Sequence, residues 1–136
     1  MAIYFSEIFK VKTLARAKAV ILTDEGPGAD SETRWQQETP YLMELIGQMI
    51  GLETDTLVLD YRCGIGRPAK ATIEASGCSV IGVDISAEMR AMARGYVGSE
   101  RFLAASPSQF DRLVQAGLGG RPQSRFGCCA LFRAGQ

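Results

Sequence analysis

Histidine is absent from the 136-residue chain, and its absence removes several classes of site. Nucleophilic sites of the Ser-His-Asp and Cys-His kinds need an imidazole to accept a proton, so the chain has neither. The four cysteines include no pair with the CxxC spacing. The usual ligand spacings of a zinc site are therefore missing, and we predict no metal ion.

Net charge and long apolar runs are absent as well. The chain carries 15 basic and 15 acidic residues, so its overall charge attracts neither nucleic acid nor an anionic membrane. No apolar run reaches the roughly 18 residues that span a bilayer, and the N-terminus lacks the features of a signal peptide. We therefore expect a cytoplasmic protein that binds neither nucleic acid nor a membrane.

Apolar residues make up 46% of the chain, which is enough for the core of one domain in a chain too short for two. Helices are expected over Ile3–Phe9 and Leu14–Leu22. The turn formers of Glu25–Ser31 predict a loop that ends where a helix starts. In Tyr41–Ile50 apolar residues recur at helical spacing, which predicts an amphipathic helix that stops at Gly51.

The second half of the chain alternates between strand and helix patterns. Short apolar runs predict strands over Thr56–Asp60, Ser79–Asp84 and Arg101–Ala105. Helices are expected between and after them: one from Pro68 to Ala75, one capped by Ser86 with Met89, Met92 and Ala93 on one side, and one from Pro107 to Ala116 with Phe110, Leu113 and Val114 facing inward. This order predicts an α/β fold with parallel strands and right-handed crossovers.

Two acidic residues and a glycine-bearing turn form the pattern that indicates a ligand-binding site. Asp60 ends the first strand, and Gly64 and Gly66 follow it where a ligand can approach the backbone. Asp84 ends the next strand about 20 residues later, the position at which a carboxylate can accept hydrogen bonds from ribose hydroxyls. The turn alone is compatible with a purely structural role, but with both strands and both acids the pattern favours cofactor binding.

The identity of the cofactor depends on Asp60. The segment from Gly64 to Ala69 also matches the GxGxxA pattern of dinucleotide-binding folds, so an oxidoreductase fragment that binds NAD is one interpretation. A carboxylate just before the turn would repel a pyrophosphate, whereas it would attract the ammonium group of an amino acid. S-adenosylmethionine has that group and NAD does not, so Asp60 favours S-adenosylmethionine.

The segments Leu57–Lys70 and Val80–Met89 together resemble the start of a class I S-adenosylmethionine-dependent methyltransferase, and the resemblance covers about residues 33–116. It implies a Rossmann-like parallel sheet with strand order 3-2-1, flanked by helices. It also implies an N-terminal extension over residues 1–32 and a partial methyltransferase domain over residues 33–136. The implied cofactor-binding residues are Asp60, Cys63, Gly64 and Gly66 around the methionine part, Asp84 at the ribose, and Ile85 and Ser106 at the adenine.

The family's reaction transfers the sulfonium methyl group by direct displacement, in which the protein mainly aligns donor and acceptor. Such chemistry needs little acid-base help, and we name no catalytic residue. We interpret Glu38 and Asp111 as solvent-facing charges. For Arg34 and Trp35 the alternatives are a place over the cofactor and ordinary packing at a helix start. The expected acceptor is a small molecule.

Two departures from the family pattern bear on function. Arg62 stands where the family has its first glycine, and we expect its Cβ and its cationic side chain to weaken cofactor binding. The chain also ends soon after the helix expected from Pro107 to Ala116, as in a shortened copy, which leaves a sheet edge open to self-association. Residues Gly127–Phe132 can cover that edge as a short fourth strand. A non-catalytic remnant that binds a nucleoside or a partner chain is the alternative to an enzyme.

Overall fold

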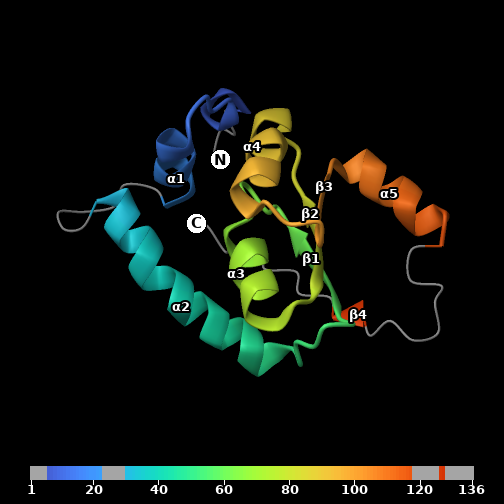
Figure 1. Cartoon of the computed structure of the whole chain (residues 1–136). Coiled ribbons are helices and arrows are strands. Elements are labelled where there is room, and N and C mark those ends of the chain that lie inside the picture. The colour runs from blue at the N-terminus through green and yellow to red at the C-terminus, as the bar shows by residue number, and fades with distance from the viewer. Residues whose placement is uncertain (1–5, 23–29, 118–125, 128–136) are drawn as a thin grey trace, which may run out of the picture.

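The computed structural model describes residues 6–22, 30–117 and 126–127 and shows an open parallel sheet with helices packed on it (Figure 1). The sheet order is β3-β2-β1-β4. The strands are β1 (Leu57–Tyr61), β2 (Ser79–Val83), β3 (Phe102–Ala105) and β4 (Phe126–Gly127). The helices are the 3₁₀ helix η1 (Ser6–Phe9) and the α-helices α1 (Leu14–Leu22), α2 (Ser31–Met49), α3 (Arg67–Ser76), α4 (Ala87–Val97) and α5 (Pro107–Gln115).

The strands confirm the fold expected from the sequence, a Rossmann-like sheet with the order 3-2-1. Strand β1 pairs with β2 in parallel, with Asp60 beside Gly82. Strand β2 pairs with β3 in parallel on its other side, with Val83 beside Ala105. The fourth strand is only two residues long and pairs in parallel with the start of β1. Gly127 is therefore in a strand as predicted, while the rest of the predicted segment, residues 128–132, lies outside the described residues.

Capping residues set the ends of the helices that the sequence predicted. Ser86 and Ser106 accept hydrogen bonds from the backbone of the first turns of α4 and α5, and Asp30 does the same for α2. Gly77 ends α3 in the left-handed conformation. These local signals explain why the sequence pattern located α3, α4 and α5 well, whereas α2 starts at Ser31, well before the apolar stripe of Tyr41–Ile50.

One face of the sheet carries the main core. The helices α3 and α4 lie next to each other against β2 and β3, and α2 runs along the outside of α3 (Figure 1). Val58 and Val80 of the sheet pack there against Ala69, Ile73 and Val97 of the helices. The predicted inner side of α4 is confirmed for Met89 and Ala93, which are buried.

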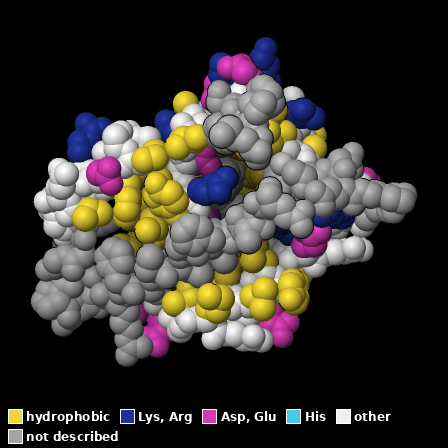
Figure 2. Space-filling view, turned by 180° about the vertical axis from the view of Figure 1, so that it is seen from behind, with side chains coloured by type: hydrophobic (Ala, Val, Ile, Leu, Met, Phe, Trp, Pro, Cys, Tyr) yellow, Lys and Arg dark blue, Asp and Glu magenta, His cyan; other side chains and the backbone are white. Residues whose placement is uncertain are grey.

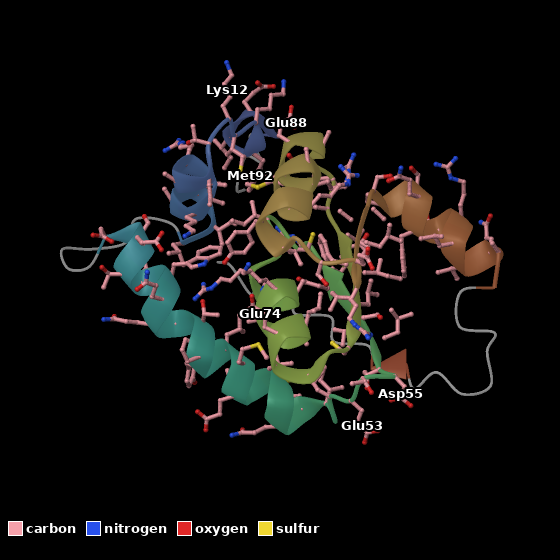
Figure 3. All side chains as sticks on the ribbon, viewed as in Figure 1. Lys12, Glu53, Asp55, Glu74, Glu88 and Met92 are labelled. Atoms are coloured by element: carbon pink, nitrogen blue, oxygen red, sulfur yellow. The ribbon has the colours of Figure 1, made fainter. Side chains whose placement is uncertain are left out.

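The N-terminal helices η1 and α1 pack against the helices that flank the sheet. Val11, Ala17 and Leu22 form a second core cluster with Trp35, Ile65 and Met89. Ser86 at the start of α4 donates its hydroxyl to the carbonyl of Phe9 at 3.0 Å. Figure 3 shows Lys12 and Glu88 at this end of the molecule, where the N-terminal segment meets α4. The division of the chain at residue 32 stays a prediction, but α1 packs on α2 rather than standing apart.

The apolar faces of α2 and α5 are less buried than their sequence patterns indicated. In α2, Ile46 is buried, whereas Tyr41 and Met49 are 65% and 72% exposed. In α5, the expectation that Val114 faces inward is wrong, because it is 48% exposed and no residue of that helix is buried. Figure 2 shows the opposite face of the molecule, on which hydrophobic side chains gather over the region of α5 and β3. Within the described ranges, no helix is long and apolar enough to cross a membrane.

Candidate functional site

The loop after β1 is fastened to the end of β2. The backbone N–H groups of Arg62 and Cys63 both donate to the carbonyl oxygen of Val83, at 2.7 and 3.0 Å. Arg62 has a φ of 67° and is the one described residue other than glycine with a positive φ. The expectation that this arginine occupies a conformation suited to glycine is therefore confirmed.

The two predicted glycines of the loop are needed for different reasons. Gly64 has a φ of 55°, and a Cβ there would lie 3.1 Å from the Cδ1 of Ile21 in α1. Gly66 has a φ of 79°, and a Cβ there would lie 2.6 Å from the Cγ2 of Val97. Gly66 therefore allows the start of α3 to pack closely on α4, while Gly64 lies where the loop meets the N-terminal helix.

Asp84 joins the loop to the end of β2 through its carboxylate. One carboxylate oxygen accepts the N–H of Gly64 at 2.9 Å, and the other accepts the N–H of Ser86 at 2.9 Å. The guanidinium of Arg90 donates to the backbone carbonyls of Asp84 and Ile85 instead of to the carboxylate. Since each carboxylate oxygen can accept more than one hydrogen bond, Asp84 keeps acceptor capacity for a hydroxyl-bearing ligand.

Asp60 is the least satisfied polar group among the described residues. Its side chain is buried with 4% of its surface exposed, and its Oδ2 atom has no hydrogen-bond partner. Burial raises the pKa of Asp60 to about 7, and the negative charge of Asp84 adds to the rise. A buried carboxylate oxygen without a partner normally costs free energy, which makes Asp60 a candidate for a ligand-binding role.

A cavity of about 610 Å³ opens at the carboxyl ends of β1 and β2. This is the edge at which ligands bind in open α/β sheets, and the volume is that of a small-molecule site. The predicted residues that line it are Asp60, Cys63, Gly64, Asp84 and Ile85. Two predicted residues do not line it: Gly66 packs against Val97, and Ser106 caps α5 and bonds to Gln109. The roles of all seven in cofactor binding stay predictions.

The N-terminal segment supplies a wall of the cavity that sequence reasoning missed. Ile8 and Phe9 of η1 and Val20 and Ile21 of α1 line the cavity. The local pattern predicted helices there, but nothing in it placed those helices beside residues more than 40 positions away. Arg62 and Arg67 also line the cavity. The lining therefore includes charged as well as apolar residues that are not among the seven predicted cofactor-binding residues.

Arg67 and Trp35 form a packed pair between α2 and α3. The guanidinium of Arg67 lies 4.7 Å from the centre of the Trp35 ring and donates to the Thr39 hydroxyl and the Trp35 carbonyl. The indole N–H of Trp35 donates to the hydroxyl of Tyr96 at 2.9 Å. Neither Trp35 nor Arg34 lines the cavity, so the packing alternative fits them better than a place over the cofactor. Burial lowers the pKa of Arg67.

Two other expectations concern charged or reactive side chains near the site. Glu38 pairs with Arg34 and Arg67, so it is a partner of these arginines rather than a free solvent-facing charge. Cys63 is buried, and burial raises the pKa of its thiol far above its usual range. A thiol held in its neutral form is a poor nucleophile, so Cys63 acts as part of the cavity wall.

No family model matches the chain, and no curated protein matches it. Solved structures do match. A geranyl diphosphate methyltransferase in complex with GPP and sinefungin is 14% identical, with a TM-score of 0.50 over 74% of this chain and 46% of that one. The same enzyme with SAM is 20% identical, with a TM-score of 0.47 over 60% of this chain and 37% of that one. A glycopeptide N-methyltransferase complexed with sinefungin is 21% identical, with a TM-score of 0.43 over 62% and 32%.

These matches concern the fold. The first of them shows that this chain shares the fold of a methyltransferase over the matched region, as the sequence resemblance implied. The chain spans less than half the length of each of the three structures.

Proposed function

We propose that the cavity binds S-adenosylmethionine and that the protein is a methyltransferase acting on a small-molecule acceptor. The observation that carries the proposal is Asp60, a residue that lines the cavity and whose buried Oδ2 atom has no hydrogen-bond partner among the described residues. An ammonium group is the ligand that a desolvated carboxylate attracts most strongly. The shared fold with a methyltransferase solved with sinefungin supports the same conclusion.

The residues of the cavity fit the parts of this cofactor. Asp60 would bind the ammonium group of the methionine part, and Asp84 would accept hydrogen bonds from the ribose hydroxyls. Ile85 is 63% exposed at the end of β2 and can pack on an adenine ring, whose burial there would cover an apolar side chain. The bound cofactor supplies an electrophilic methyl group, and the protein's part is to hold and orient it.

Apolar residues shape the remaining part of the cavity. Phe9 and Ile21 lie on the N-terminal side, and Leu42 of α2 and Pro107 of α5 complete the lining. A wall of this kind excludes water from a reacting methyl group and accommodates an acceptor with apolar surface. We infer a small organic acceptor for that reason.

Calorimetric titration of S-adenosylmethionine and S-adenosylhomocysteine into the protein tests the cofactor site. We expect micromolar dissociation constants for the wild type and a loss of binding in Asp84→Ala, with NAD giving no heat. The Asp55→Asn variant is the matched control, because Asp55 is an exposed carboxylate next to the start of β1 (Figure 3), at the other end of that strand from the cavity. Its affinity should equal that of the wild type.

The enzymatic part of the proposal needs a second measurement. Methyl-labelled S-adenosylmethionine incubated with the protein and a pool of small molecules should yield labelled product, and Asp84→Ala should yield none. If the protein binds S-adenosylmethionine but transfers no methyl group, it is a nucleoside-binding protein and the enzymatic part of the proposal is wrong. A folded protein that binds neither nucleoside would contradict the proposed function altogether.

A further inference from the structure

Arg62 differs from the other charged residues of the cavity because no described partner engages its guanidinium. Arg67 is held by α2, and Asp84 accepts two backbone N–H groups. Arg62 lines the same cavity, its side chain is exposed, and neither an ion pair nor a side-chain hydrogen bond links it to any described residue. An unpaired cation at the mouth of a ligand cavity is available to an anionic group of the ligand.

We infer that Arg62 binds the carboxylate of the amino-acid end of the cofactor, while Asp60 binds the ammonium group of the same end. The inference rests on the function proposed above and extends it to this chain's departure from the usual glycine. An amino-acid end carries both charges, on two groups bonded to the same carbon atom. Asp60 is near the end of β1 and Arg62 is in the loop that follows, two residues further along the chain, and both line the cavity, so they can bind the two charges together.

The backbone around Arg62 fixes where its side chain starts. Its N–H and the next one both bond to the Val83 carbonyl, and its φ of 67° is held by that anchored loop. The arginine side chain extends from this anchored backbone into solvent, so its guanidinium can adopt several positions. A ligand carboxylate that enters the cavity therefore meets a positioned but adjustable donor.

In the free protein, Arg62 does not lower the pKa of Asp60. The causes that raise the pKa of Asp60 are burial and Asp84, and no cation lowers it. Arg62 therefore does not stabilise the ionised form of the buried carboxyl group, and both side chains stay available to a ligand. A zwitterion would satisfy both at once, because its two charges are matched in sign to the two side chains.

This role reverses the effect on binding that the sequence led us to expect from Arg62. The left-handed backbone at this position is held by the hydrogen bonds to Val83, so we expect its strain to affect the stability of the fold rather than the affinity. The charge has two opposing effects, repulsion of the sulfonium and attraction of the carboxylate. The carboxylate can form a bidentate pair with the guanidinium at contact distance, which the sulfonium cannot.

A series of three ligands separates these effects. S-adenosylmethionine carries a sulfonium and an amino-acid end, S-adenosylhomocysteine carries only the amino-acid end, and methylthioadenosine carries neither. We expect Arg62→Ala to weaken binding of S-adenosylhomocysteine by about tenfold, the usual scale for losing one charged hydrogen-bonded pair, and S-adenosylmethionine by less. Binding of methylthioadenosine should not change.

Two further variants sharpen the test. Arg62→Lys keeps the charge but loses the planar fork, and should recover part of the lost affinity. Arg101→Ala removes an exposed arginine just before β3, at the opposite end of the sheet from the cavity, and should bind all three ligands as the wild type does. Thermal unfolding of each variant shows that it is folded.

The outcomes distinguish this inference from the proposed function. If Arg62→Ala binds S-adenosylhomocysteine as tightly as the wild type, or binds it more tightly, the inference is wrong while the cofactor site stands. An equal loss for all three ligands also overturns it, because methylthioadenosine has no carboxylate. If the folded wild type binds none of the three, the proposed function fails and the inference fails with it.

Discussion

Replacing Asp60 with asparagine should stabilise the free protein at neutral pH and abolish cofactor binding. Asparagine has nearly the same shape as aspartate but carries no charge, so it removes the desolvated carboxylate without opening a cavity. The pKa of Asp60 rises from 3.8 to about 7 in the folded protein, which corresponds to about 4 kcal/mol. That is a large share of the roughly 5–15 kcal/mol that holds a typical domain together.

The sign of the effect sets the pH range in which it is visible. A carboxyl group with a raised pKa in the folded state binds its proton more tightly there than in the unfolded chain. Its contribution to stability is complete below the unfolded pKa and is lost as the pH rises through the folded pKa. The wild type should therefore lose up to about 4 kcal/mol between about pH 4 and pH 7 relative to Asp60→Asn, with little further change above that range.

Urea unfolding at a series of pH values, followed by circular dichroism, measures this difference directly. Asp55→Asn is again the control, because removing an exposed carboxylate should give a difference from the wild type that does not grow with pH. A constant difference between Asp60→Asn and the wild type from about pH 4 to about pH 8 would refute the reasoning. It would mean that the Asp60 carboxylate is solvated in the free protein and offers a ligand no uncompensated charge.

Three further results are expected from the same structure. The affinity for S-adenosylmethionine should rise between about pH 5 and pH 8, because Asp60 must lose its proton to pair with the ammonium group; calorimetry at constant ionic strength checks this, and a flat profile would contradict it. Gly66→Ala should lower the unfolding free energy by about 2–4 kcal/mol in urea titrations, since its Cβ would meet Val97 and its φ is positive. Arg62→Gly should raise the unfolding free energy by up to about 1 kcal/mol, because glycine relieves the left-handed strain at some cost in chain entropy; an unchanged or lower melting temperature would count against that strain.

Local signals explain which parts of the fold could be predicted from the sequence. The strand around Val58 is a short apolar run between polar boundaries, and α4 starts where Ser86 accepts the hydrogen bond that its sequence position suggested. The left-handed conformation of Arg62 followed from its place in a glycine pattern. In each case the residues that decide the structure are close together in the chain.

Features that depend on distant residues could not be predicted in the same way. The periodicity of α2 treated Tyr41 and Ile46 alike, but only Ile46 meets a neighbouring element. Phe9 and Ile21 enter the cavity wall because the N-terminal segment packs on α4 and α2, which no local pattern records. The unpaired state of the Asp60 carboxylate likewise depends on every element around it, so a sequence pattern can locate the residue but cannot show that its charge is uncompensated.

The single carbonyl of Val83 that accepts two N–H groups has a consequence for exchange with solvent. Loops usually open independently of the sheets they connect, and their amide hydrogens exchange quickly. Here the amides of Arg62 and Cys63 are bonded to the end of β2, so they can exchange only when that strand end separates from the loop. We expect their protection in heavy water to match that of the amides of β2 rather than that of surface turns. The cavity then keeps its shape whether or not a ligand is bound, and binding involves little reordering of the backbone that carries Asp60 and Arg62.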